Sequence, residues 1–159
     1  MSAITVHIVN IVSPTYQQVW QVREEVLRKP LGMSLKNEDL GMDANDTIFV
    51  AQTDDKVIGC VMLHHLNAGL MKLRQMAVYP EWQGKGVGKL LVQHAEEYAS
   101  EQNYKKIVLH ARMVAADFYS KLGYHIVSNV FTEVGIPHVV MQKDNGLDLL
   151  PNQRRCTFV

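Results

Sequence analysis

A glycine-rich segment is the clearest candidate for chemistry in this sequence. It reads Gln83-Gly84-Lys85-Gly86-Val87-Gly88-Lys89 and lies between an apolar run that ends Met76-Ala77-Val78 and a long amphipathic stretch. The start of a helix offers unpaired backbone amides and a partial positive charge, and glycine lets a phosphate approach because it has no Cβ. The spacing therefore predicts a site for a phosphate or pyrophosphate group.

Two familiar phosphate-loop patterns do not fit this segment. The dinucleotide fingerprint needs a small residue where Lys89 stands, and the P-loop needs Ser or Thr where Leu90 follows that lysine. The pattern that is left is Gln-x-x-Gly-x-Gly, at Gln83, Gly86 and Gly88. Taken alone, such a turn is more often a flexible loop than a ligand site. The choice between these two interpretations therefore depends on the neighbouring residues.

A second pattern lies downstream and reads Ala115-x-x-Phe118-Tyr119-x-Lys121-x-Gly123-Tyr124. The two patterns together resemble the signatures of the GNAT superfamily of N-acyltransferases, in an order of elements that covers residues 4–143. Val22-Arg23-Glu24-Glu25-Val26 and Gly135-Ile136-Pro137-His138 are similar to the ElaA-like and YjcF-like branch of that superfamily.

The resemblance implies acetyl-CoA as co-substrate and no metal. The segment from Gln83 to Lys89 would hold the pyrophosphate, the backbone of Met76 to Val78 would bind the pantetheine arm, and Phe118 and Lys121 would add cofactor contacts. The backbone amide of Val78 would stabilise the oxyanion. Tyr119 stands at the position of the catalytic acid. A tyrosine, with a reference pKa of about 10, carries a proton at neutral pH that it can give to the leaving thiolate, whose thiol has a reference pKa of about 8.5.

The general base stays unassigned. Arg74 and Gln75 stand where many members of the superfamily carry a glutamate, and Arg112 stands where an asparagine is common. Four side chains remain open for the role, directly or through water: Glu24, His110, Glu133 and His138. Phe118 and Tyr119 have a second interpretation as core aromatics of an amphipathic helix.

Arg23 and His138 are the candidate substrate-binding residues. Arg23 falls within the apolar stripe of the first expected helix, where an arginine needs an anionic partner. It either forms a structural ion pair or extends to water, or it binds an anion of the substrate or cofactor. A lone histidine such as His138 is usually a surface or satisfied core residue, and only the branch resemblance makes it a candidate. Asp39, Asp43 and Asp46 could attract a cationic amine, but we expect a solvated acidic loop.

The balance of charges argues against a polyanionic partner. Sixteen Lys and Arg residues match sixteen Asp and Glu residues, so no broad positive field is available for nucleic acid or an anionic membrane. Cys60 and Cys156 show no metal-binding or disulfide spacing, which fits a reducing, cytoplasmic setting. The N-terminus lacks a signal-peptide pattern, and no apolar run approaches transmembrane length.

The hydrophobic periodicity predicts a protein that mixes strands and helices. Strands are expected at 4–8, 47–52, 57–66, 71–78, 107–111, 124–127 and 139–142, and helices at 14–29, 86–101 and 114–121, with a broken helix and loop over 31–46. The length fits one compact domain over residues 1–144, with 145–159 as a C-terminal tail and no separate domain.

The resemblance narrows this expected mixture of strands and helices to an α/β (mixed α+β) GNAT fold. That fold is a twisted, mostly antiparallel mixed sheet of six or seven strands, flanked by about four helices, with the fourth and fifth strands splayed apart. We expect an acetyltransferase that moves an acetyl group to the amine of a small molecule in a ternary complex. A non-catalytic acyl-CoA-binding module and a protein or peptide N-acetyltransferase stay open as alternatives, and so does a homodimer.

Overall fold

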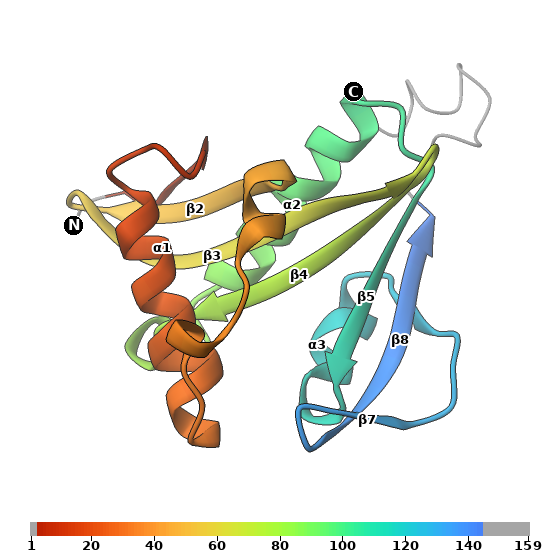
Figure 1. Cartoon of the computed structure of the whole chain (residues 1–159). Coiled ribbons are helices and arrows are strands. Elements are labelled where there is room, and N and C mark those ends of the chain that lie inside the picture. Colours follow the sequence, from red (N-terminus) through yellow and green to blue (C-terminus); the bar gives the residue numbers. More distant parts are fainter. Residues whose placement is uncertain (1–2, 145–159) are drawn as a thin grey trace. The chain divides into compact units, whose positions relative to one another are not determined.

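The computed structural model describes residues 3–144, and Figure 1 shows the course of its helices and strands. The strands are β1 Thr5–Val9, β2 Thr47–Thr53, β3 Lys56–Asn67, β4 Leu70–Val78, β5 Lys106–Arg112, β6 His125–Ile126, β7 Phe131–Glu133 and β8 Ile136–Asp144. The α-helices are α1 Tyr16–Arg23, α2 Val87–Glu101 and α3 Ala116–Lys121. Short helical turns are η1 Glu24–Arg28, η2 Lys29–Leu31, η3 Leu35–Asn37, η4 Gly41–Asn45, η5 Pro80–Trp82 and η6 Met113–Ala115. The tail expected at 145–159 lies outside the described residues.

Hydrogen bonding within the described part of the chain links eight strands in the order β1-β2-β3-β4-β5-β8-β6, with β7 paired to β8. β4 and β5 run parallel, whereas β1–β2, β2–β3, β5–β8, β6–β8 and β7–β8 are antiparallel. The predicted mixed, mostly antiparallel sheet is confirmed. The strand number exceeds the expected six or seven because β7, only three residues long, is too short to show a period.

Pairing between β4 and β5 covers only the first part of each strand. The register runs from Leu70↔Lys106 to Leu73↔Leu109 and ends there. β5 nevertheless continues to Arg112, where it pairs with β8. Strands four and five are therefore hydrogen-bonded at one end only, as the predicted splaying requires.

The chain divides into two compact units. Within the described residues, the first unit comprises 3–64 and 74–95, and the second comprises 65–73 and 96–144. Each helix within residues 3–144 is too short or too polar to span a bilayer.

A buried cluster fills one side of the sheet in the first unit. Val19 and Val22 of α1 pack with side chains of β2, β3 and β4, namely Ile48, Val50, Val57, Cys60, Met62 and Ala77. Figure 1 shows α1 in front of these strands. The predicted first helix is thus confirmed, although it continues beyond Arg23 as a π-helical turn, η1. Such turns widen a helix locally and occur often at functional sites.

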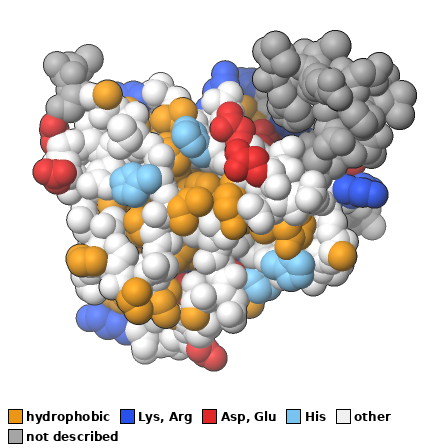
Figure 2. Space-filling model, turned by 90° about the horizontal axis from the view of Figure 1, so that it is seen from above, with side chains coloured by type: hydrophobic (Ala, Val, Ile, Leu, Met, Phe, Trp, Pro, Cys, Tyr) orange, Lys and Arg blue, Asp and Glu red, His pale blue; other side chains and the backbone are white. Residues whose placement is uncertain are grey.

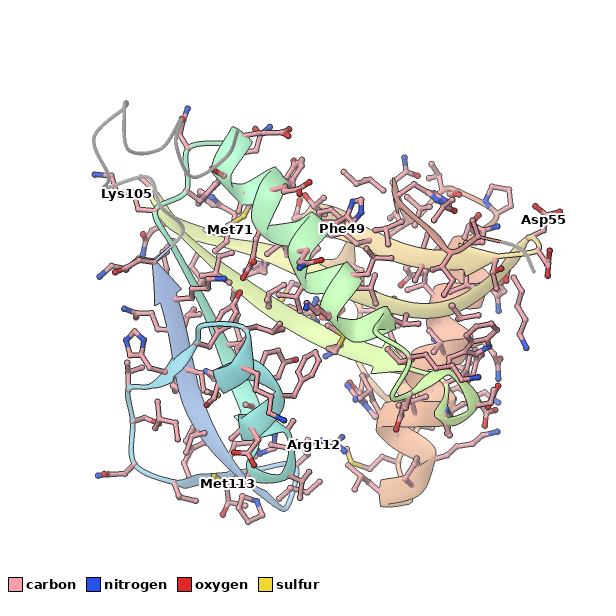
Figure 3. The ribbon with its side chains drawn as sticks, turned by 180° about the vertical axis from the view of Figure 1, so that it is seen from behind. Phe49, Asp55, Met71, Lys105, Arg112 and Met113 are labelled. Carbon is pink, nitrogen blue, oxygen red and sulfur yellow. The ribbon has the colours of Figure 1, made fainter. Side chains whose placement is uncertain are left out.

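The other side of the sheet in the first unit packs against the start of α2. A Cβ added to Gly59 of β3 would lie 3.0 Å from the Ala77 carbonyl oxygen and 3.3 Å from the Leu91 side chain. Glycine at position 59 therefore lets β3, the end of β4 and α2 approach closely. The β2–β3 hairpin turns at Asp54 and Asp55, both with positive φ, and Asp55 lies at its tip in Figure 3.

In the second unit, β5 alternates buried and partly exposed residues. Ile107, Leu109 and Ala111 are buried, and Val108, His110 and Arg112 lie on the opposite face. After α3 the chain reverses at Gly123, whose φ is +97°. A left-handed residue ends a helix readily when it is glycine, and the sequence predicted this end.

Candidate functional site

The glycine-rich turn leads from β4 through η5 into α2, as predicted. Gly84 and Gly86 have φ values of +76° and +84°. A Cβ added at either position would meet nothing within 4 Å. The backbone therefore favours glycine at both places for its conformation, and the space above them is open.

The start of α2 offers backbone donors to this open space. After Gln83, the first backbone amide that donates to a backbone carbonyl among the described residues is that of Leu90. It donates to the Gly86 carbonyl oxygen at 3.0 Å. α2 is 15 residues long, enough for an appreciable positive potential at its start. Lys85 and Lys89 are exposed at the turn, and Lys85 Nζ lies 5.2 Å from the centre of the Trp82 ring. The turn is thus suited to bind an anion.

Gln83 fixes the turn to the end of β4. Its side-chain Nε2 donates to the Val78 carbonyl oxygen at 2.9 Å, so this amide positions the loop instead of pointing at open space. Ala77 and Val78 are buried, and Met76 is partly buried. Just before them, Gln75 has a φ of +56°, which is unusual for a residue other than glycine and distorts the strand locally. β4 is therefore irregular where the sequence predicts pantetheine binding.

Arg23 is completely buried and forms an ion pair inside the first unit. Its Nη1 donates to Asp43 Oδ2 at 2.7 Å, and the two side chains are 0% and 1% exposed. Its Nε donates to Gln75 Oε1 at 3.2 Å, and the Tyr16 hydroxyl donates to the same Asp43 oxygen at 2.5 Å. Among the described residues, Arg23 Nη2 has no hydrogen-bond partner. The ion-pair interpretation of Arg23 is therefore confirmed.

The prediction of a solvated acidic loop is wrong for Asp43 and Asp46. The Asp46 carboxylate forms an ion pair with Arg74, and its Oδ1 lies 2.7 Å from His64 Nδ1. The Asp46 side chain is 0% exposed. Burial alone would raise the pKa of Asp43, but hydrogen bonds from Tyr16 and Arg23 and the positive charges of Arg23 and Arg74 lower it below its usual range. Asp39 alone is exposed. Sequence reasoning missed Asp43 because its partners lie far away in the chain, and the need of Arg23 for an anion was the only signal.

Tyr119 lies on α3 in the second unit and is 7% exposed. Burial raises its pKa to about 12, so the phenol keeps its proton at neutral pH. No hydrogen bond among residues 3–144 uses its hydroxyl. Its ring packs edge-on against the rings of Phe118 and Tyr124, with distances between ring centres of 4.9 Å and 5.9 Å. Phe118 is 37% exposed and Lys121 is exposed, so the aromatic core interpretation fits Tyr119 better than Phe118.

Three of the four candidate bases come together in the second unit. His110 Nδ1 lies 2.9 Å from Glu133 Oε1, and His138 Nε2 lies 3.8 Å from Glu133 Oε2. His138 is 4% exposed, and its Nδ1 donates to the Ile136 carbonyl at 2.8 Å. Burial alone would raise the pKa of Glu133, but the His110 hydrogen bond and the charges of His110, His138 and Lys72 lower it. Glu133 is therefore a carboxylate at neutral pH.

The fourth candidate, Glu24, has a structural role. Ser34 Oγ donates to its Oε2 at 2.6 Å and the Leu35 amide to its Oε1 at 2.8 Å. These hydrogen bonds, Ser34 first, lower the pKa of Glu24. Glu24 ties η1 to the following loop and is a weak proton acceptor.

No group of three or more His, Cys, Asp or Glu side chains in residues 3–144 has an arrangement that could hold a metal ion. Figure 2 shows one face of the molecule, where Lys and Arg side chains are scattered at the margin and form no continuous basic surface.

A family model described as the acetyltransferase (GNAT) domain matches residues 13–145. Uncharacterized protein YyaT of Bacillus subtilis is 41% identical over 73 residues, 46% of this chain and 49% of YyaT. The uncharacterized N-acetyltransferase YjcF of the same organism is 28% identical over 129 residues, 80% of this chain and 91% of YjcF. The match thus spans only about half the length of YyaT.

Solved structures share the fold at low sequence identity. Escherichia coli ElaA matches with a TM-score of 0.75 and 18% identity, covering 90% of this chain and 99% of ElaA. A GNAT family acetyltransferase from Elizabethkingia anophelis with acetyl-CoA bound matches with a TM-score of 0.67 and 17% identity, covering 89% of this chain and 97% of the other. Both likenesses concern the fold alone.

Proposed function

Because the chain belongs to the GNAT acetyltransferase family, whose model matches residues 13–145, we propose that it transfers an acetyl group from acetyl-CoA to the amine of a small molecule. The acceptor attacks directly, in a ternary complex with the cofactor. The similar acetyltransferase from Elizabethkingia anophelis binds acetyl-CoA, which supports the choice of co-substrate. The balanced charges and the family fit a cytoplasmic enzyme, and a homodimer stays a prediction.

One observation supports the cofactor site above all. Gly84 and Gly86 adopt left-handed conformations with open space above them, at the start of a 15-residue helix. A diphosphate in that space would meet backbone amides and no Cβ. The segment from Gln83 to Lys89 would hold this group, and Met76 to Val78 would bind the pantetheine arm as an added strand does. Phe118 and Lys121 are further proposed cofactor contacts.

The reaction requires four changes of bonding. The amine nitrogen loses a proton and forms a bond to the thioester carbonyl carbon, and the Val78 amide stabilises the resulting oxyanion. The carbon–sulfur bond then breaks. The thiolate takes a proton from Tyr119, which is protonated at neutral pH, and solvent returns a proton to the tyrosine.

Binding and turnover measured together test this function. We expect calorimetry to detect acetyl-CoA binding, and a panel of small amines to release free thiol above the rate of hydrolysis. Folded protein that binds no acetyl-CoA would overturn the cofactor assignment. Binding without thiol release would favour the non-catalytic module, and acetylation of peptides but not of small amines would favour a peptide acetyltransferase.

Tyr119→Phe tests the acid within the same experiment. Loss of a general acid lowers turnover by about 10²-fold or more, and acetyl-CoA affinity should change little. Tyr124→Phe is the matched control, since the Tyr124 hydroxyl donates to Glu96 at 2.9 Å and has no proposed role in the reaction. Equal effects of both substitutions on turnover would show that Tyr119 is only a packing residue.

A further inference from the structure

An imidazole–carboxylate pair lies on the face of β5 opposite its buried side chains. His110 alternates with the buried Leu109 and Ala111, and Glu133 reaches it from β7 at 2.9 Å. Because Glu133 is ionised and can only accept a hydrogen bond, His110 Nδ1 carries the hydrogen. The lone pair of a neutral His110 is then on Nε2, which makes no hydrogen bond among the described residues. The His110 side chain is 29% exposed, so this nitrogen can receive a proton from a bound molecule.

The surrounding residues hold the pair in place. The Phe131 ring packs edge-on against the His110 ring, with 5.3 Å between the ring centres. It is tilted against the His138 ring, with 6.0 Å between the ring centres. His138 is fixed by its hydrogen bond to the Ile136 carbonyl and lies 3.8 Å from the second oxygen of Glu133. With a side chain only 5% exposed, His138 is a fixed neighbour that limits the movement of Glu133, whereas His110 is exposed enough to contact a substrate.

The position of His110 in the strand connects the pair to acetyl transfer. Leu73↔Leu109 is the last pair of the β4–β5 register, and His110 is the next residue of β5. His110 thus stands at the first position of β5 that β4 does not pair. Under the proposed function, the pair also belongs to the same unit as Tyr119, the proposed acid.

We infer that His110 is the general base that accepts the proton of the acceptor amine, and that Glu133 and His138 are its positioning residues. This inference rests on the proposed acetyl transfer. The amine N–H proton moves to His110 Nε2 as the nitrogen–carbon bond forms, and Glu133 stabilises the imidazolium. The proton then leaves to solvent, while the cleaved thiolate takes its proton from Tyr119. The structure of β4 supports the assignment, because Arg74 is bound to Asp46 there and supplies no base.

The test compares His110→Ala with His125→Ala, using acetyl-CoA and the best amine of the panel. His125 is an exposed histidine of the same unit and has no proposed role. We expect His110→Ala to lower kcat by about 10²-fold or more, to leave acetyl-CoA binding intact, and to recover part of its activity when imidazole is added. The loss should be smaller for weakly basic amines, which shed their proton easily.

Glu133→Gln tests the positioning residue with a readout that a purely structural role would not move. Nitrogen NMR of the imidazole should show the Nδ1–H tautomer of His110 in the unsubstituted protein and a mixture in Glu133→Gln, with a lower kcat and unchanged cofactor affinity. If His110→Ala turns over as fast as His125→Ala, the base assignment is wrong. If the unsubstituted protein binds acetyl-CoA but acetylates no amine, the proposed function fails and the base assignment fails with it.

Discussion

At the scale of single residues, the buried charges of the first unit decide stability. Arg23 has one carboxylate partner, Asp43, at 2.7 Å, and the Nη2 of Arg23 has no partner among the described residues. Asp43→Asn would leave the guanidinium buried without its counter-charge. Breaking such a pair costs about 3–5 kcal/mol of unfolding free energy, and urea denaturation monitored by circular dichroism measures it.

Asp39→Asn is the control for this loss. Asp39 is exposed and, within residues 3–144, accepts a hydrogen bond only from the nearby Gly41 amide, so its substitution should change stability little. The Asp43 contribution also depends on pH. Because the folded pKa of Asp43 is lowered from 3.8, its stabilisation is present above pH 3.8 and is lost as the pH falls through the folded pKa. Equal stability of the two variants would mean that Arg23 is balanced by another group.

At the scale of elements, glycine substitutions can distinguish the effect of backbone strain from the effect on ligand binding at the turn before α2. Gly84→Ala places a Cβ on a backbone with φ of +76° and in the space proposed for pyrophosphate. Gly32→Ala is a matched control, because Gly32 has a φ of +69° and equally open surroundings. Both substitutions should cost about 1 kcal/mol of stability from the left-handed conformation.

Only Gly84→Ala should weaken acetyl-CoA binding, and we expect a loss of about tenfold or more, since it disturbs several amide contacts worth about 1 kcal/mol each. Calorimetric titration of both variants measures the difference. Equal affinities would show that the cofactor does not approach the backbone at this turn.

The same elements show how far the sequence could predict the structure. α2 and β2 to β5 appear within one or two residues of their expected bounds, because apolar residues repeat strongly and glycine, proline or aspartate marks the ends. β7 was missed because it has three residues and closes through Val134, whose φ is +47°. Gly135, with a φ of +75°, completes this turn, but a valine is not expected at positive φ. The family motifs point to the glycine turn and to Tyr119 as candidates, because each motif is local in sequence.

The candidate base required the fold. His110, Glu133 and His138 were each among four open candidates, and nothing local selects one of them. Their contact depends on the pairing of β8 with both β5 and β7, in which His138 lies opposite Arg112 and Phe131. Asp43 likewise looked like a loop residue until α1 placed Arg23 against it. Long-range pairing therefore supplied the part of the candidate site that sequence patterns could not.

At the scale of the whole molecule, buried acids with raised pKa values make the fold sensitive to alkali. Burial raises the pKa of the Cys60 thiol from 9.0 to about 12 in the first unit, and that of Tyr119 from 10.0 to about 12 in the second. Between the unfolded and folded pKa values, the unfolded chain has lost protons that the folded chain still holds. Rising pH therefore favours unfolding, by up to about 1.4 kcal/mol per pH unit for each such group.

We expect the urea midpoint to be level near pH 8 and to fall steadily from about pH 9 upward. In Cys60→Ala the fall should begin one unit later, near the tyrosine value of 10.0, although the starting stability is lower. Acids of both units contribute to this fall. If residues 1–144 form the single domain that we expect, urea unfolding should show one transition at every pH. Two separate transitions would contradict that expectation, and a midpoint that stays level up to pH 11 would show that these groups are not buried.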